Sequence, residues 1–148
     1  MLAELIKLEN INLDLQAQTK DELFEEMATQ LNQNGYIKNV KKFKKDLYKR
    51  ESEGNTGIGF GIGIPHAKSK YVKQCCIGIG VSKQGIDYDA IDGEKVHLIF
   101  MLAIEGHEAD LHLQALAALS RKLIHEDFRE KLLNASSKEE IFELICEE

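Results

Sequence analysis

The sequence predicts an α/β fold, in which one domain holds a mixed β-sheet flanked by helices. Short apolar segments with strand character are interspersed along the chain with longer segments of helical periodicity. Residues 96–104 are almost continuously apolar, which is typical of a central strand covered on both faces. Asp92 and Gly93, just before them, are typical of a tight hairpin, and such a hairpin makes the sheet mixed.

The first half of the chain predicts a strand and two helices. Residues 11–15 alternate apolar and polar side chains, as a half-buried strand does. A capping box at Thr19 and Glu22 opens a helix that ends at Gly35. Its expected buried face is Leu23, Phe24, Met27, Ala28 and Leu31. Asn39 caps a second helix, which carries Val40, Phe43 and Leu47 on one face and Arg50 near its end.

The second half predicts further strands and then helices to the end. Residues 62–64 and 77–81 have strand character, and Gly78 and Gly80 thin one face of the latter. From Asp110 the pattern is helical, in three pieces, the last opened by a capping box at Ser137 and Glu140. The expected inward side chains are Leu113, Leu116, Ala117, Ser120 and Leu123, then Phe128, Leu132 and Leu133, then Ile141, Leu144 and Ile145.

Length and composition limit the classes of protein. The 148 residues contain no repeat and no proline-rich linker, which indicates a single domain over residues 1–148. The net charge of −6 argues against nucleic acid as the main partner. No apolar run approaches the ~18 residues of a membrane helix, and the N-terminus lacks the layout of a signal peptide. Three cysteines make a poor disulfide framework, so we expect a reduced, cytoplasmic compartment.

One segment is locally basic. Between Lys38 and Arg50 the chain carries seven Lys and Arg residues against a single acid, Asp46. Such a run usually forms the solvated face of a helix. The alternative is a docking surface for an acidic partner or a phosphoryl group.

The segment from Gly54 to His66 is the most informative feature. It holds five of the 11 glycines and the only proline, Pro65, directly before His66. A P-loop is excluded, because its pattern GxxxxGK followed by Ser or Thr does not fit this spacing. A dinucleotide fingerprint is excluded as well, because the glycines have the wrong spacing and lead to a proline rather than a helix. The segment therefore presents a histidine on a tightly shaped backbone.

The other histidines differ in their sequence surroundings. His97 has a structural position in the apolar strand, and His125 lies at a helix end. His107 and His112 flank the start of a helix, but their spacing is not HExxH and no third ligand is evident, so no metal site is expected. A role for His112 depends on whether it meets His66 in space.

Several of these residues together resemble a known family. The pattern consists of Arg50 and Glu51, the run from Thr56 to Gly59, Gly61, Gly63, the run from Pro65 to Ala67, and His112 followed by an apolar helix with Leu113, Leu116 and Leu119. It resembles the fructose/mannitol type of enzyme IIA domain from the bacterial sugar phosphotransferase system. The resemblance covers nearly the whole chain in length and in the order of elements.

The resemblance implies a phosphotransferase with a phosphohistidine intermediate. His66 would accept the phosphoryl group from the phosphohistidine of the carrier HPr and pass it to a cysteine of enzyme IIB, on a separate chain, for sugar uptake. His112 would be the second active-site histidine, Arg50 the cation of the motif, and Thr56 and Gly57 part of the phosphate environment. No metal, nucleotide or other cofactor is required, because the donor is already a phosphohistidine.

Alternatives stay open from the sequence. A regulatory, nitrogen-type enzyme IIA would be phosphorylated on the same histidine but would act by binding other proteins. A non-catalytic domain could bind an anion in the glycine turn. His107 could replace His112 as the second histidine. Cys75 and Cys76 could belong to a fused enzyme IIB, although core thiols leading into the strand at 77–81 are the simpler interpretation.

Overall fold

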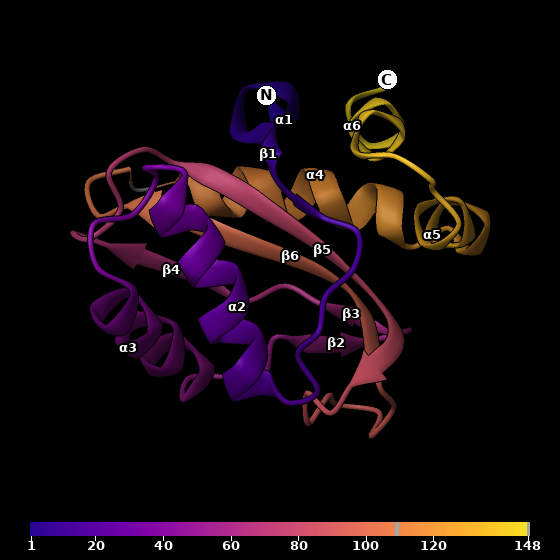
Figure 1. Cartoon of the computed structure of the whole chain (residues 1–148), viewed down its shortest axis with the longest axis horizontal. Coiled ribbons are helices and arrows are strands. Elements are labelled where there is room, and N and C mark those ends of the chain that lie inside the picture. Colours follow the sequence, from indigo (N-terminus) through magenta and orange to yellow (C-terminus); the bar gives the residue numbers. More distant parts are fainter. Residues whose placement is uncertain (109, 148) are drawn as a thin grey trace.

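A six-stranded mixed sheet runs through the centre of the computed structural model, which describes residues 1–108 and 110–147 (Figure 1). Its strands are β1 (Ile6–Asn12), β2 (Gly57–Gly59), β3 (Ile62–Gly63), β4 (His66–Ser69), β5 (Cys76–Ile86) and β6 (Val96–Glu105). The order is β1-β5-β6-β3-β2, and β4 also pairs with β6. β5 and β6 are antiparallel, whereas β3 and β4 both run parallel to β6. The sheet is therefore mixed, as predicted.

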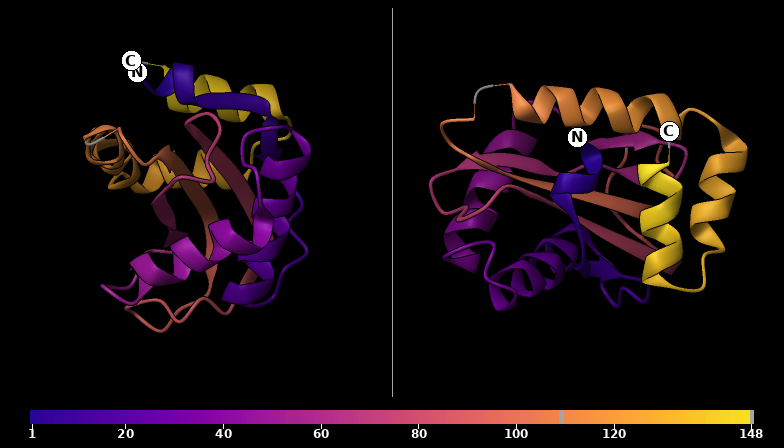
Figure 2. Two further views of the ribbon diagram at one scale, coloured as in Figure 1. Left: turned by 90° about the vertical axis from the view of Figure 1, so that its left-hand side faces the viewer. Right: turned by 90° about the horizontal axis from the view of Figure 1, so that it is seen from above.

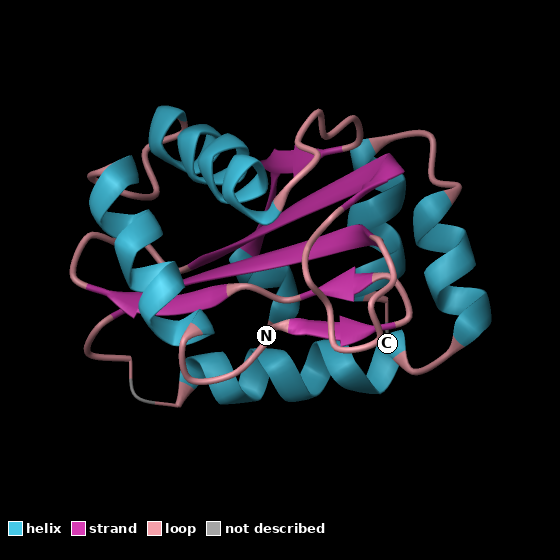
Figure 3. Ribbon diagram, turned by 90° about the horizontal axis from the view of Figure 1, so that it is seen from below, coloured by secondary structure: helices cyan, strands magenta, loops and turns pink. Residues whose placement is uncertain are grey.

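Helices cover both faces of this sheet. They are α1 (Leu2–Leu5), α2 (Lys20–Gln33), α3 (Val40–Glu51), α4 (Leu111–Leu123), α5 (Glu126–Leu133) and α6 (Lys138–Cys146). Figure 2 shows α4 lying along the sheet with α5 and α6 beside it, and Figure 3 shows the strands running between the two layers of helices. One core lies under α2 and α3, and a second under α1 and the three C-terminal helices. None of the helices in the described ranges is long and apolar enough to cross a bilayer.

Side-chain caps explain where three helices begin. Thr19, Asn39 and Ser137 each accept a hydrogen bond from the backbone N–H three residues later, at 3.2, 2.9 and 3.1 Å. All three N-termini are confirmed as predicted from these residue types. Gly35, at φ +86°, follows α2 in the left-handed region that glycine adopts at helix ends. The buried residues of α2 are the five that its periodicity predicted.

From Leu98 to Ile104 the central strand β6 contributes alternate side chains to the two cores. Ile99, Met101 and Ala103 face α2 and α3. The side chains on the other face are Leu98, Phe100, Leu102 and Ile104. The continuous apolar run therefore does mark a strand buried on both sides, as the sequence predicted.

Two glycines of β5 allow close packing beneath α2. A Cβ on Gly78 would lie 3.4 Å from Met27 Cε, and one on Gly80 only 2.5 Å from Leu15 Cδ1. This face of β5 is thinned where α2 and the chain before it approach, which confirms the predicted role of the two glycines.

The first strand and the hairpin differ from the prediction. β1 begins at Ile6 and ends at Asn12 instead of covering residues 11–15. Leu15 is nevertheless buried, because its N–H bonds the carbonyl of Val81 at 3.0 Å and its side chain fills the space above Gly80. β5 and β6 are antiparallel as expected, but residues 87–95 form a longer connection in place of a two-residue turn, with Gly93 donating to the carbonyl of Ala90.

The predicted inward face of α4 is wrong in part. Leu113 is 57% exposed, Ala117 and Ser120 are also exposed, and the helix buries Ala115, Leu119 and Leu123. Apolar residues occur on several sides of this helix, so its sequence does not select one stripe, and packing against β6 decides which side is buried. In the last two helices Leu132, Ile141 and Ile145 are buried as predicted, whereas Leu133 is 37% exposed.

Candidate active site

A depression of about 400 Å³ opens at the edge of the sheet where β3 gives way to β4. Its walls come from the C-terminal half of α3, from the start of β4 and from the first turn of α4. The lining residues are Asp46, Lys49, Arg50, Glu53, His66, Ala67, Lys68 and His112. The site thus assembles three segments that are far apart in the sequence, and it includes His66, His112 and Arg50 together.

The backbone of His66 is fixed in the sheet. β3 pairs with β6 through Gly63 and Ile99, and β4 resumes the pairing at His66 and Leu102. Between them stands Pro65, which has no N–H to donate, while its carbonyl accepts from the N–H of Leu102 at 2.9 Å. The interruption of the edge therefore turns the main chain just before His66 without releasing it from β6.

A hydrogen bond sets the tautomer of His66. Its Nδ1 lies 2.8 Å from the carbonyl oxygen of Ile64, which can only accept, so Nδ1 carries the proton. Nε2 is then the nitrogen with the free lone pair. His66 is buried, with 8% of the residue exposed. Burial lowers the pKa of His66; the Ile64 contact opposes this, and the positive charge of Arg50 adds to the lowering. At neutral pH the group is a neutral imidazole, which is a nucleophile.

His112 stands beside His66. The two rings are stacked, with centroids 6.3 Å apart and planes inclined by 29°. Burial lowers the pKa of His112, and the charge of Lys68 lowers it further, so this ring is also neutral at neutral pH. Within the described residues its buried Nδ1 has no hydrogen-bond partner. A proton there would lack an acceptor, which favours the tautomer with the proton on Nε2.

The guanidinium of Arg50 is held in place by a backbone carbonyl. It lies in the last turn of α3, and its Nη1 donates to the carbonyl of Gly54 at 2.9 Å. This bond uses one of the five donors of the group and leaves others for an anion. Lys49 and Lys68 line the same depression. The carboxylate of Asp46, in the same wall, accepts from the Ser69 hydroxyl at 2.5 Å. The arrangement can hold a phosphoryl group next to a neutral imidazole nucleophile.

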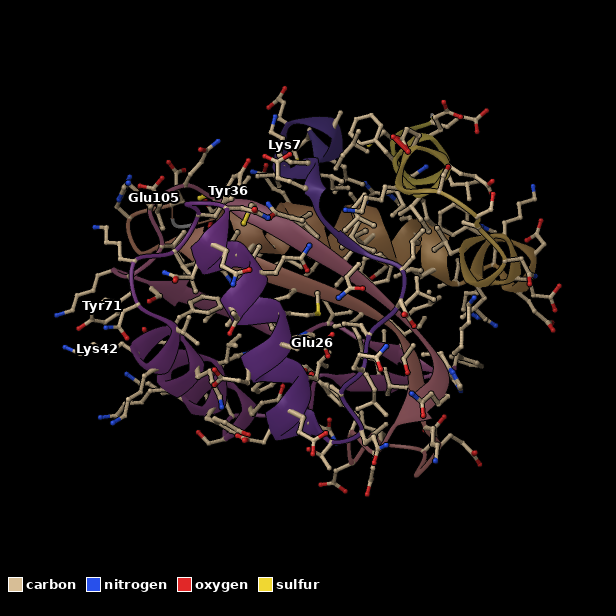
Figure 4. All side chains as sticks on the ribbon, viewed as in Figure 1. Lys7, Glu26, Tyr36, Lys42, Tyr71 and Glu105 are labelled. Atoms are coloured by element: carbon tan, nitrogen blue, oxygen red, sulfur yellow. The ribbon has the colours of Figure 1, made fainter. Side chains whose placement is uncertain are left out.

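The basic run on α3 divides into two parts. Toward its middle, Lys44 pairs with Asp21 at 3.3 Å and with Glu25 at 3.2 Å on α2. Lys42 lies over the ring of Tyr71, 5.2 Å from its centroid, and Figure 4 shows these two side chains together. Of the basic residues in this run, Lys49 and Arg50 line the depression. The run therefore combines side chains that contact other parts of the fold with two cations beside His66.

Other candidate groups lie elsewhere. His107 is 75% exposed at its side chain and faces Glu105 and Glu108, at 3.4 and 3.8 Å. The structure brings His112, not His107, to His66. His97 Nδ1 contacts the carbonyl of Ser82 at 2.8 Å, which is the structural position expected for it.

Cys75 and Cys76 pack into the hydrophobic cores. Cys76 is fully buried in the core under α2 and α3, and burial raises its pKa to about 12. Cys75 Sγ accepts from the N–H of Glu105 at 3.2 Å. Neither lines the depression around His66. These contacts favour the simpler interpretation of the pair.

Thr56 and Gly57, expected in the phosphate environment, do not line the depression. Thr56 is buried, and its hydroxyl contacts Glu51 and Tyr88. A Cβ on Gly57 would lie 2.8 Å from Cα of Ala90, so the glycine is needed for close packing of the chain there. Thr56 also accepts a hydrogen bond from the N–H of Ile64 at 2.9 Å, so it contacts the segment that leads to His66.

Residues 4–148 match the family described as the phosphoenolpyruvate-dependent sugar phosphotransferase system, EIIA 2. This chain belongs to that family. The match to the model covers nearly all of the chain, including the glycine segment and both stacked histidines. The resemblance noted from Arg50, His66 and His112 is confirmed at the level of the family.

Two relatives of this EIIA domain are named as fructose-specific. The chain is 38% identical over 144 residues to the PTS system fructose-specific EIIABC component of Bacillus subtilis, covering 97% of this chain and 23% of that protein. It is 48% identical over 101 residues to the PTS system fructose-specific EIIA component of Haloferax volcanii, covering 68% and 66%. The chain thus spans about a quarter of the first relative's length and 66% of the second's.

Solved structures show the same fold. Nitrogen regulatory protein IIA-Ntr from Neisseria meningitidis superposes with a TM-score of 0.88 at 32% identity, over 97% of each chain. The mannitol enzyme IIA of Escherichia coli, in a complex with phosphorylated enzyme IIB, gives 0.78 at 26% identity, over 95% of this chain and 98% of that one. The predicted enzyme IIA architecture is confirmed.

Four residues of this EIIA site were not anticipated from the sequence, namely Asp46, Glu53, Ile64 and Lys68. Lys68 follows His66 by two positions, and on a strand such residues share a face, so the spacing contained a signal. Asp46 precedes Arg50 by one helical turn, which also places them on one side. Ile64 acts only through its carbonyl, and no pattern of residue types reveals such a role.

Proposed function

We propose that the chain is the enzyme IIA of a sugar phosphotransferase system, and that Nε2 of His66 receives the phosphoryl group from phosphorylated HPr and passes it to a cysteine of enzyme IIB. One observation carries the proposal. The Nδ1–H of a buried, neutral His66 is held on the Ile64 carbonyl, and the same side chain lines a depression shared with His112 and Arg50.

In the accepting step the lone pair of Nε2 attacks phosphorus. The bond between phosphorus and the donor's histidine nitrogen breaks, and its electron pair returns to that nitrogen. The ring of His66 then bears positive charge with its proton still on Nδ1, and the Ile64 carbonyl stabilises that charge. In the second step a cysteine thiolate of enzyme IIB attacks phosphorus, and the electron pair of the breaking P–N bond returns to Nε2.

The surrounding groups stabilise the charge on the transferred oxygens. Transfer of a phosphoryl group depends mainly on in-line positioning and on stabilising the three equatorial oxygens. The guanidinium of Arg50 and the Nε2–H of His112 are donors on two sides of the depression, and Lys68 adds a third positive or polar group. Because His66 is neutral before transfer, no proton has to leave Nε2 before this nitrogen attacks phosphorus.

The names of the relatives support a role in sugar uptake. Two relatives are called fructose-specific, and one solved relative forms a complex with phosphorylated enzyme IIB. We place this activity in the cytoplasm, where both of the proposed protein partners would meet the chain. The sugar itself is not contacted in this scheme.

A regulatory role is the second candidate. The solved structure with a TM-score of 0.88 is a nitrogen regulatory protein, and it exceeds the mannitol enzyme IIA in both structural similarity and identity. A regulatory enzyme IIA would carry the phosphoryl group on the same histidine and bind other proteins according to its phosphorylation.

Incubation with phosphorylated HPr tests the proposal. We expect one phosphoryl group on His66, located by mass spectrometry at neutral to basic pH, and phosphorus attached to Nε2 by NMR. His66→Ala abolishes acceptance, whereas His107→Ala, the matched control on an exposed histidine, retains it. Stoichiometric phosphorylation of His66→Ala contradicts the site. Tight binding of inorganic phosphate without any transfer would favour a non-catalytic anion-binding domain.

Transfer onward separates the two roles. Rapid loss of the label to the cysteine of an enzyme IIB encoded beside this chain supports sugar uptake. Stable phosphorylation that no enzyme IIB removes, together with binding to another protein in only one phosphorylation state, supports regulation.

A further inference from the structure

A continuous chain of buried and partly buried hydrogen bonds leads to His66. Lys20 Nζ is 3.1 Å from Glu51 Oε2, and the Glu51 carboxylate accepts from both the hydroxyl and the backbone N–H of Thr56. The carbonyl of Thr56 accepts from the N–H of Ile64 at 2.9 Å. The carbonyl of Ile64 in turn accepts from Nδ1 of His66 at 2.8 Å. The path therefore runs from α2, through the end of α3, to the reactive ring.

The directions of the hydrogen bonds in this chain are determined. The single hydroxyl proton of Thr56 goes to Glu51, so the Tyr88 hydroxyl must donate to Thr56 Oγ1 across their 2.6 Å contact. Burial raises the pKa of Tyr88, which therefore keeps the proton it donates. Tyr88 and Thr56 are buried, and the Glu51 side chain is 9% exposed. A fully satisfied network at this depth restricts its members to one arrangement.

We propose that Glu51 and Thr56 are positioning residues for phosphoryl transfer: by tying the end of α3 to the segment before Pro65, they aim the Ile64 carbonyl at Nδ1 of His66 and so keep Nε2 unprotonated. The inference rests on the proposed function. It assigns to Thr56 a role through the Ile64 backbone in place of a contact with the phosphoryl group.

Glu51 and its neighbour Arg50 both hold the segment that follows α3. Arg50 precedes Glu51 and reaches the depression, while its guanidinium is held by the Gly54 carbonyl, at the start of the same segment. Arg50 thus holds this segment at Gly54, and Glu51 holds it at Thr56. Lys20 balances the charge of Glu51, so the buried carboxylate does not add net repulsion when a phosphoryl group arrives nearby.

Matched threonine variants test the inference. Thr56→Val removes the hydroxyl and keeps the branched shape, Thr56→Ser restores a hydroxyl, and Thr29→Val makes the same change at a threonine of α2 whose hydroxyl contacts exposed Glu25. Two measurements are made on each: the ring ¹⁵N shifts of His66 above the ordinary histidine pKa, and the rate of acceptance from phosphorylated HPr.

We expect Thr56→Val to shift His66 toward the tautomer protonated on Nε2. We also expect a fall of about tenfold in the limiting rate of transfer, with the KM for phosphorylated HPr unchanged, because a small misplacement of reacting atoms costs at least this much. Thr56→Ser recovers both properties, and Thr29→Val changes neither. Glu51→Gln gives the same signs as Thr56→Val.

A purely structural role has a different result. If Thr56→Val lowers only the melting temperature, with the His66 tautomer and the transfer rate of the folded protein as in wild type, the inference is wrong. Should Thr56→Val fail to fold, Tyr88→Phe removes only the hydroxyl that donates to Thr56, and it is expected to give a smaller shift of tautomer in the same direction. The tautomer of His66 is measured by NMR without phosphorylated HPr. A wild-type protein that accepts no phosphoryl group would therefore overturn the proposed function, while the tautomer in Thr56→Val would still decide whether the network orients His66.

Discussion

His66 and His112 stack their imidazole rings across the depression, with 6.3 Å between the centroids, although 46 positions of sequence separate them. One ring belongs to a strand of the sheet and the other to the first turn of a helix that covers the opposite core. Each ring is kept neutral mainly by burial. The pair can therefore supply a nucleophilic nitrogen and an N–H donor at one place, with a different tautomer for each ring.

Replacing His112 should slow transfer and leave the fold intact. We expect His112→Ala to lower the rate of phosphoryl acceptance by about 10- to 100-fold, which corresponds to losing one hydrogen bond to a charged group. His112→Gln, which keeps an N–H donor at a similar distance from the backbone, should retain more of the rate. Rapid-quench measurements with phosphorylated HPr check this, and a rate for His112→Ala equal to wild type would remove this residue from the site.

Arg50 should require its guanidinium and not merely its charge. We expect about a 100-fold loss of rate for Arg50→Ala and about a tenfold loss for Arg50→Lys, because lysine cannot both hold the Gly54 carbonyl and present a fork of donors to the phosphoryl oxygens. Lys45→Ala, an exposed change on the same helix and outside the depression, is the control. Equal rates for Arg50→Lys and wild type would show that charge alone suffices.

The pH dependence of acceptance should follow the lowered pKa of His66. Protonation of Nε2 removes the lone pair that attacks phosphorus, so the rate falls on the acid side. Since burial moves this pKa below its ordinary value, we expect a plateau through neutral pH and a decline only below about pH 6.5. Stopped-time assays across this range check it, and a decline that begins above the ordinary histidine pKa would contradict the assignment.

The same pKa has a consequence for stability. The unfolded chain binds a proton at His66 at a higher pH than the folded chain does, so the free energy of unfolding falls as the pH is lowered through about 6.5. We expect His66→Gln to make this slope shallower. Urea unfolding at about pH 7.5 and about pH 5.5 measures the difference, above the range in which carboxylates titrate. An unchanged slope in His66→Gln would show that this histidine titrates alike in both states.

Gly57 should be far less tolerant of a side chain than Gly54. In Gly57→Ala the new Cβ would lie 2.8 Å from the backbone Cα of Ala90, whose chain is held against Gly57 by the hydrogen bond from the N–H of Ile91, and we expect a loss of about 1–3 kcal/mol. Gly54→Ala meets only Arg50 Nη1, at 3.8 Å, and neither glycine has positive φ. Thermal unfolding of both variants checks the contrast. Equal melting temperatures would mean that the space beside Ala90 adapts.

Features set by neighbouring residues were predictable. The caps at Thr19, Asn39 and Ser137 mark helix starts because the side chain bonds a backbone group only three positions away. The buried face of α2 follows from a clean period of apolar side chains. β6 was predictable from a different local signal, because a strand that is buried on both faces is apolar along nearly its whole length.

Features set by distant pairing were not predictable from patterns. β4 is only four residues long, and it forms because His66 to Ser69 lie against Leu102 to Glu105. The buried side of α4 depends on how the helix meets the sheet, so Leu113 was placed wrongly. The choice of His112 over His107 likewise needed the position of α4, and spacing in the sequence could not provide it. The roles of Thr56 and Ile64 depend on backbone groups, which all residues share.

The pairing of the chain with β6 stops after Gly63 and resumes at His66, directly after Pro65. The main chain on the C-terminal side of His66 is laddered to β6 through four consecutive residue pairs, and the preceding carbonyl is bonded to Leu102. A phosphoryl group added to Nε2 thus meets a backbone with no room to rearrange, and the free and phosphorylated forms should superpose. We therefore expect partners to distinguish the two forms by charge and not by shape, because phosphorylation would place a dianionic group beside the positively charged ring on an otherwise unchanged surface.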